Sequence, residues 1–117
     1  MVDDEEAVRK LVCAVLKSNG YDVLDASNGG VAMAAYEKNA HKINLVITDI
    51  VMPQMSGFEL GRQLSEVSPE LKILYMSGYR DNADGAPGEV QRPFLHKPFT
   101  PDGLLSKVRE VLDAEKV

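Results

Sequence analysis

Hydrophobic positions along the chain alternate between helical and strand spacing. Four segments have helical character. The first carries an apolar stripe at i, i+3, i+4, i+7 and i+8 and stops at Asn19-Gly20, a typical helix end. The second, from Val31 to Ala40, is rich in alanine, and the third follows Pro53 to Gly57. The last is capped by Thr100, with Pro101 at its first position. The predicted apolar positions of the first, third and last helices are Val8, Leu11, Val12, Val15, Leu16; Phe58, Leu60, Leu64, Val67; and Leu104, Leu105, Val108, Val111, Leu112.

Short apolar runs between these helices predict strands. Residues 43–48 and 71–76 are nearly continuous in apolar residues, as expected for strands buried on both faces. Residues 21–26 and 94–96 predict two further strands. Strands that alternate with helices favour an open, mostly parallel α/β sheet. The 117 residues fit a single domain, so residues 1–117 are treated as one unit.

Charge and cysteine content narrow the function classes. The chain has 13 basic and 18 acidic residues, a net charge of −5, which argues against direct binding to nucleic acid. Its apolar runs are far shorter than the roughly 20 residues of a membrane helix, so no direct membrane contact is expected. Cys13 is the single cysteine, which favours a reducing, cytoplasmic compartment.

Polar residues with chemical potential fall at the ends of the predicted strands. Asp3 and Asp4 follow Met1-Val2, Asp49 follows the strand at 43–48, and the remaining two are Ser77 and Lys97. Right-handed crossovers bring the carboxyl ends of parallel strands to one edge of the sheet. We therefore expect three carboxylates, one hydroxyl and one ammonium to gather there.

Such a cluster suits a divalent cation and phosphoryl chemistry. Ionised carboxylates about 4 Å apart repel one another by several kcal/mol at an effective dielectric near 20, and their oxygens are ligands that suit Mg²⁺. A carboxylate in such a site can act as a nucleophile toward phosphorus, giving an aspartyl phosphate. Lys97 and the Ser77 hydroxyl are candidates to neutralise the phosphoryl oxygens.

Four motifs in this order resemble the receiver domain of two-component response regulators. They are Asp3-Asp4-Glu5, Asp49-Ile50-Val51-Met52-Pro53, Met76-Ser77-Gly78-Tyr79 and Lys97-Pro98-Phe99, and they span nearly the whole chain. The amino-acid sequence around Ser77 and Lys97 is similar to that of receivers attached to hybrid histidine kinases. The resemblance implies a flavodoxin-like, doubly wound sheet of five parallel strands in the order 2-1-3-4-5.

The resemblance also implies a role for each site residue. Asp49 would accept a phosphoryl group from a histidine kinase or phosphotransfer domain, and an attached or separate output domain would receive the signal. Mg²⁺ would be held by Asp4, Asp49 and the Val51 carbonyl, with Asp3 acting mainly through a metal-bound water. Ser77 and Lys97 would contact the phosphoryl group, and Ser77 and Phe94 would move in the switch.

Two segments depart from the family pattern. Only Met1-Val2 precede the acidic pair, where the family has a full central strand, so we expect a truncated first strand. The expected consequence is lower stability, or association of chains by dimer formation or strand exchange. Residues 80–91 contain two glycines and a proline where the family has its fourth helix, so we expect that helix to be short or absent.

Three other interpretations of these residues fit part of the pattern. Asp3, Asp4 and the glutamates after them could simply favour a helix N-terminus. A phosphatase of the haloacid dehalogenase type also uses an aspartate nucleophile, but it places a second aspartate where this chain has Val51. A receiver that signals without phosphorylation would keep the fold, and displacement of Asp3-Asp4 by the short first strand would favour it.

Overall fold

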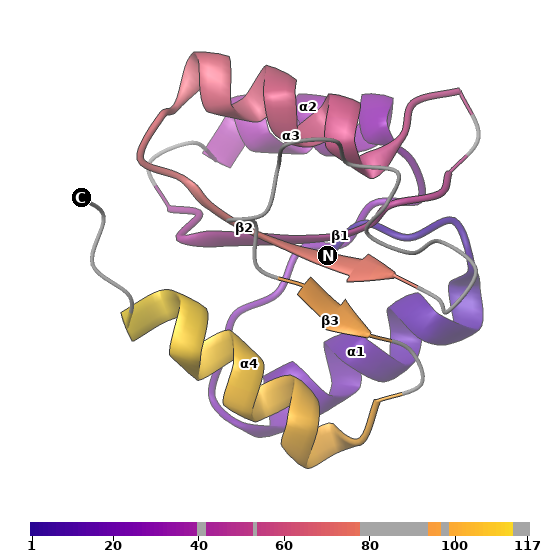
Figure 1. Ribbon diagram of the computed structural model, residues 1–117, viewed down its shortest axis with the longest axis vertical. Helices are drawn as coiled ribbons and strands as arrows, with labels where there is room; N and C mark the ends of the chain where they lie inside the picture. Colours follow the sequence, from indigo (N-terminus) through magenta and orange to yellow (C-terminus); the bar gives the residue numbers. More distant parts are fainter. Residues whose placement is uncertain (40–41, 53, 78–93, 97–98, 114–117) are drawn as a thin grey trace.

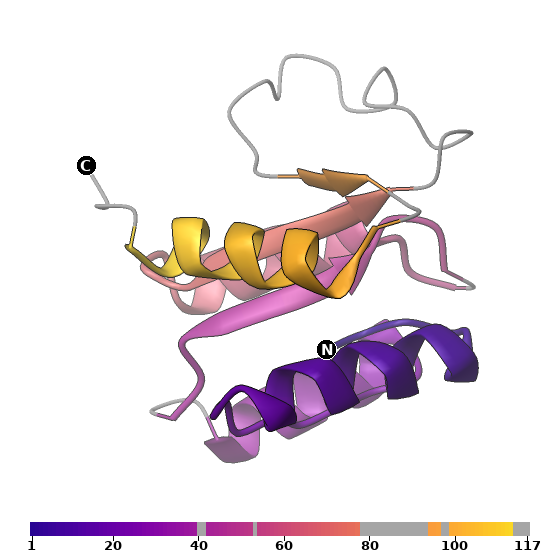
Figure 2. The same ribbon diagram turned by 90° about the horizontal axis from the view of Figure 1, so that it is seen from below.

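The fold is a parallel sheet covered by helices on both faces. The computed structural model describes residues 1–39, 42–52, 54–77, 94–96 and 99–113. Its strands are β1 (Leu45–Asp49), β2 (Lys72–Ser77) and β3 (Phe94–His96), in the order β1-β2-β3. Two helices lie on each side of the sheet (Figures 1 and 2): α2 (Gly29–Asn39) with α3 (Gly57–Val67), and α1 (Glu6–Ser18) with α4 (Pro101–Asp113).

The register of the sheet aligns the strand ends. Asp49 at the end of β1 stands opposite Met76 of β2, and Ser77 stands opposite His96 of β3. All three strands are parallel, as the alternation of strands and helices predicted. Their carboxyl ends therefore meet at one edge of the sheet.

The N-terminal side of the sheet is reduced to single-residue bridges. Val2 forms parallel bridges with both Ala26 and Thr48. Its backbone N–H donates to the Ile47 carbonyl at 2.7 Å, and its carbonyl accepts from the Asp49 N–H at 3.0 Å. The segments are thus arranged as Ala26, Val2, β1, β2, β3, which is the order 2-1-3-4-5 with two bridges in place of the first two strands.

The prediction of a strand over residues 21–26 is wrong except at Ala26. Strand pairing needs a neighbour, and of this segment Ala26 pairs with Val2. A cavity of about 1020 Å³ lies beside this segment, lined in part by residues 20–26 and 42–47. Within the described residues, the N-terminal segment pairs with the sheet through Val2.

Two apolar clusters fill the layers between sheet and helices. The cluster on the α2–α3 side contains Leu60, Leu64, Tyr36 and Val46, and the cluster on the α1–α4 side contains Val12, Leu74, Met76, Leu104 and Val108. Two of the predicted apolar positions, Leu11 and Val67, are exposed, with exposed fractions of 54% and 61%.

The helix ends follow the signals in the sequence. Thr100 Oγ1 accepts from the Gly103 N–H at 2.9 Å, which confirms the predicted cap of α4. Gly20 has a φ of 90° directly after the C-cap residue Asn19 of α1. The second helix begins at Gly29 rather than Val31, and Ala40 lies outside the described residues, as does the predicted loop at 80–91.

No helix within the described part of the chain is long and apolar enough to span a bilayer.

Candidate functional site

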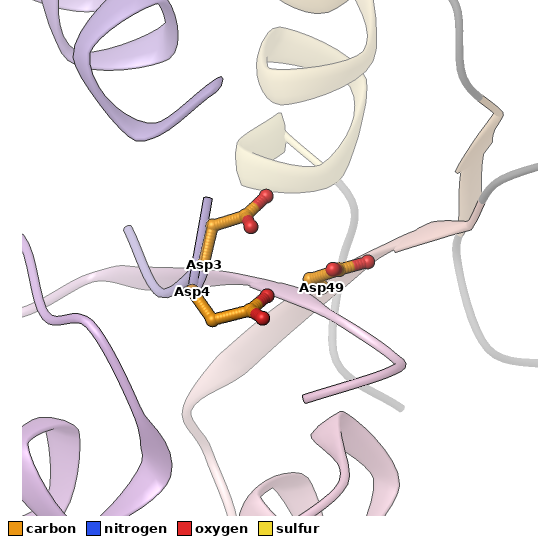
Figure 3. Close-up of side chains that lie close together, drawn as sticks. All are labelled: Asp3, Asp4 and Asp49. Atoms are coloured by element: carbon orange, nitrogen blue, oxygen red, sulfur yellow. The ribbon is translucent and has the colours of Figure 1, made fainter. Parts of the chain in front are cut away.

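Three carboxylates meet at the carboxyl edge of the sheet. Asp3, Asp4 and Asp49 each place a carboxylate oxygen within 4.8 Å of the others (Figure 3). Asp3 and Asp49 are buried, with exposed fractions of 0% and 4%, whereas Asp4 is exposed. The three carboxylates of the predicted cluster therefore lie together, and one of them faces solvent.

Asp49 is held by the regular part of the sheet. Its N–H pairs with Val2, and its Oδ1 accepts from the Ile50 N–H at 3.0 Å. The Ile50 N–H also donates to the Met76 carbonyl at 3.1 Å, so the turn after β1 is bonded to β2. These backbone bonds fix the direction in which the Asp49 carboxylate leaves the strand.

The loop after Asp49 returns to pack tightly against it. The Gly57 N–H donates to the Ile50 carbonyl at 2.7 Å, and α3 begins at that glycine. A Cβ at residue 57 would lie 2.1 Å from the Asp49 carbonyl oxygen, closer than atoms approach. Gly57 is therefore required by the shape of the site, whereas the sequence pattern indicated only a break before a helix at this position.

Asp3 and Asp4 belong to the turn that leads into α1. The Asp3 N–H donates to the Ala26 carbonyl at 3.2 Å, and Asp3 Oδ1 accepts from the Glu5 N–H at 2.9 Å. The latter bond resembles the helix-start role considered as an alternative. That role alone would not require Asp3 to lie within reach of Asp49, and both arrangements occur together here.

Arg9 supports this turn from α1. Its Nη1 donates to the Asp3 carbonyl at 2.9 Å, and its Nε donates to Asp25 Oδ2 at 3.0 Å. Arg9 is not among the site residues predicted from the sequence. The signal available was a lone arginine one turn after an acidic run, which is too common a pattern to single out.

The other predicted site residues are placed less completely. Ser77 ends β2 directly after Met76, the register partner of Asp49. Val51 lies two residues beyond Asp49 with 56% exposure. Lys97 lies outside the described residues. Phe94 is half-buried on β3 and its ring centroid lies 5.8 Å from that of Tyr75, in an aromatic group that also includes Phe58.

The donor set suits a hard divalent cation. All three side chains offer oxygen, and Mg²⁺ is bound in proteins through one or two carboxylates with further oxygen ligands. Two ionised carboxylates at 4.8 Å repel by roughly 3 kcal/mol at an effective dielectric of 20. A cation relieves this repulsion, so the residues present fit the group.

Comparison with known proteins agrees with the geometry. The sequence model of the response regulator receiver domain family matches residues 1–109 of this chain. The sensor kinase CckA of Brucella abortus is 35% identical over 117 residues, which cover 98% of this chain and 12% of the kinase. The response regulator receiver protein CpdR of the same organism is 32% identical, with 97% of this chain and 95% of that protein covered.

Solved structures show the same likeness. The receiver domain of NtrX from Brucella abortus has a TM-score of 0.87 at 29% identity, with 97% of both chains covered. The receiver domain of the hybrid histidine kinase CckA has a TM-score of 0.81 at 29% identity, covering 96% of this chain and 95% of that one. The chain belongs to the response regulator receiver domain family of two-component signalling, whose members bind Mg²⁺ at an acidic site.

Proposed function

We propose that this receiver accepts a phosphoryl group on Asp49 from a histidine kinase or a phosphotransfer domain. The observation that carries the proposal is the convergence of Asp3, Asp4 and Asp49 within 4.8 Å at the carboxyl edge of the sheet. Among the three, Asp49 ends a strand of the regular ladder and is fixed by backbone bonds on both sides. A nucleophile needs such a fixed position, because misplacement by about 1 Å can cost a hundredfold in rate.

In this proposal Mg²⁺ is held by Asp4, Asp49 and the Val51 carbonyl, with Asp3 acting through a metal-bound water. When bound, the cation neutralises charge on the carboxylates and on the phosphoryl oxygens. The burial of Asp3 and the exposure of Asp4 suit this division, because Asp4 is open to an arriving ion.

The chemical step is a displacement at phosphorus. A lone pair of an Asp49 carboxylate oxygen forms the new O–P bond while the P–N bond of the donor phosphohistidine breaks, and the donor imidazole keeps that electron pair and takes a proton. Ser77 donates a hydrogen bond to the phosphoryl group and Lys97 pairs with its charge. The product is an aspartyl phosphate and an unmodified histidine.

The proposed switch couples this step to a surface. Ser77 moves toward the phosphoryl oxygens, which exist only in the modified state, and Phe94 changes its packing on β3. Phe94 touches the aromatic group on α3 and β2, so its movement would be felt on that face. Relatives include a long sensor kinase and a receiver protein of similar length, so the output could be an attached domain or a separate protein.

Intact mass measurement tests the phosphoacceptor. The wild-type chain, Asp49→Asn and the control Asp102→Asn are incubated with Mg²⁺ and acetyl phosphate. Asp102 is an exposed residue in the first turn of α4, so its substitution makes the same chemical change away from the site. One added phosphoryl group on the wild type and on Asp102→Asn, with none on Asp49→Asn, is expected.

An adduct that persists on Asp49→Asn would contradict the assignment of the phosphoacceptor. If the folded wild type neither gains mass nor releases phosphate, the second candidate is favoured, namely a receiver that signals without phosphorylation. The single-residue bridge at Val2 favours that candidate. This bridge attaches the segment that carries Asp3 and Asp4 to the sheet, so the two carboxylates are weakly positioned for a metal ion.

A further inference from the structure

Arg9 joins the acidic turn to two other segments of the protein. Its Nη1 donates to the backbone carbonyl of Asp3 at 2.9 Å, and its Nε forms an ion pair with Asp25 Oδ2 at 3.0 Å. Its side chain is largely buried, with 15% exposure, while that of Asp25 is 54% exposed. One planar guanidinium on α1 therefore bonds the turn at residue 3 and the segment at residue 25 at the same time.

These contacts lie where the sheet itself offers little support. Val2 has one bridge to each neighbour, so few ladder bonds hold the Asp3 backbone. The bonds at Asp3 include those to Ala26, Glu5 and Arg9, and of these three the Arg9 bond comes from a charged side chain. Because Asp4 lies between Asp3 and Glu5, fixing those two residues also fixes the path of the Asp4 backbone.

We propose that Arg9 is a positioning residue that sets the Mg²⁺ affinity of the Asp3–Asp4–Asp49 cluster by holding the Asp3 carbonyl. This inference rests on the proposed function, since it assigns a metal to that cluster. Arg9 does not bind the ion. It orders the backbone that carries two of the three carboxylates, as groups beyond the direct ligands do in metal sites.

The sign of the effect separates positioning from charge. Arg9 is a cation near the site, so its charge alone opposes the arrival of Mg²⁺. Loss of that charge would tighten Mg²⁺ binding if electrostatics were the whole of its role. Loss of the hydrogen bond to Asp3 would weaken binding, because the carboxylates would then have to be ordered by the ion.

The experiment measures the Mg²⁺ dissociation constant by titration calorimetry in the full chain. Arg9→Met removes both contacts with little change in helix propensity, and Arg9→Lys keeps the charge without the planar fork. The matched control is Arg62→Met, which removes the same charge from an exposed arginine on α3 paired with Glu59 and Glu66. Circular dichroism in the absence of metal confirms that each variant is folded at the temperature of the titration.

We expect the dissociation constant to rise about tenfold or more in Arg9→Met, less in Arg9→Lys, and under about twofold in Arg62→Met. A constant that is unchanged or lower in folded Arg9→Met would overturn the inference. Amide exchange of the Glu5 N–H, which donates to Asp3 Oδ1 at 2.9 Å, supplies a metal-free measurement. It should become faster in Arg9→Met than in the wild type.

The two measurements distinguish the failure of this inference from that of the proposed function. If the wild type binds no Mg²⁺, the metal assignment fails, and with it the role of Arg9 in affinity. If the wild type binds Mg²⁺ but neither its affinity nor Glu5 exchange changes in Arg9→Met, Arg9 has no positioning role and the proposed phosphoacceptor stands.

Discussion

The two halves of the sheet are built very differently. On one side, β1, β2 and β3 form a continuous parallel ladder between two apolar clusters. On the other side, Val2 and Ala26 make single bridges beside a cavity of about 1020 Å³. Asp49 comes from the first half, and Asp3 and Asp4 come from the second. The functional site is thus assembled across a boundary between a strongly and a weakly supported part of the fold.

This difference assigns unequal roles to the carboxylates. A residue at the end of a regular strand is positioned by the ladder whether or not a ligand is bound. Residues on a turn with few ladder bonds depend on side-chain contacts such as those of Arg9, and they gain most from an ion that ties them to Asp49. Ligand binding in such a site stabilises the weaker part by mass action.

The largest expected effect comes from Gly57→Ala. The added Cβ would meet the Asp49 carbonyl oxygen at 2.1 Å, so the loop and the end of β1 must separate. We expect a loss of about 3 kcal/mol or more in the free energy of unfolding, measured by urea titration, together with loss of Mg²⁺ binding. The end of β1 would then no longer hold Asp49 in a fixed position.

Gly30→Ala is the control for that substitution. Gly30 lies in the first turn of α2, and a Cβ there meets only Asn28 Oδ1, at 3.4 Å. Alanine favours the helix over glycine by up to about 1 kcal/mol, so stability should be unchanged or higher. Equal losses in the two variants would show that the close approach at Gly57 is not what shapes the site.

The next comparison places one leucine truncation in each half. Leu74 on β2 has 0% exposure, and Leu74→Ala should lower the free energy of unfolding by about 2–5 kcal/mol. Leu24 beside the cavity is 51% exposed, and Leu24→Ala should lower it by under about 0.5 kcal/mol. A large loss in Leu24→Ala would mean that the N-terminal side is packed more firmly than its bridges indicate.

The smallest effect concerns an exposed ion pair away from the site. Hydrogen bonds from Arg62, which has the larger effect, and from Gln63 lower the pKa of Glu59 to about 2, from 4.5 in the unfolded chain. The ionised form is favoured by folding, so this stabilisation is present above pH 4.5 and is lost as the pH falls toward 2. The difference in melting temperature between the wild type and Glu59→Gln should shrink over that interval.

That difference should stay small at every pH, because both side chains are exposed and water screens the pair. A melting temperature difference that does not depend on pH would mean that the Glu59 charge adds nothing to stability.

The sequence predicted the regular half well, because periodicity reports burial. The apolar runs at 43–48 and 71–76 became β1 and β2 within two residues, and Thr100-Pro101 marked the start of α4. It predicted the aspartate cluster because strand ends must meet at one edge. These inferences rest on local sequence patterns, each contained in one segment, and on the general handedness of crossovers between parallel strands.

The rest depended on contacts between segments. Residues 21–26 have the composition of a strand, but pairing also needs a neighbouring segment, and of these residues Ala26 pairs, with Val2. The need for glycine at residue 57 arises from a carbonyl eight positions earlier, and the role of Arg9 arises from Asp3 and Asp25. No periodicity in the sequence reports such distances.

Amide hydrogen exchange with and without Mg²⁺ tests most directly whether the site joins two unequal halves. We expect Mg²⁺ to slow exchange at the Asp3, Glu5 and Ala26 amides, which pair within the weaker half. Amides of β2 such as those of Leu74 and Met76 should slow far less, because the ladder already protects them. Uniform slowing across both groups, or none at Asp3 and Glu5 while Mg²⁺ is bound, would contradict the account.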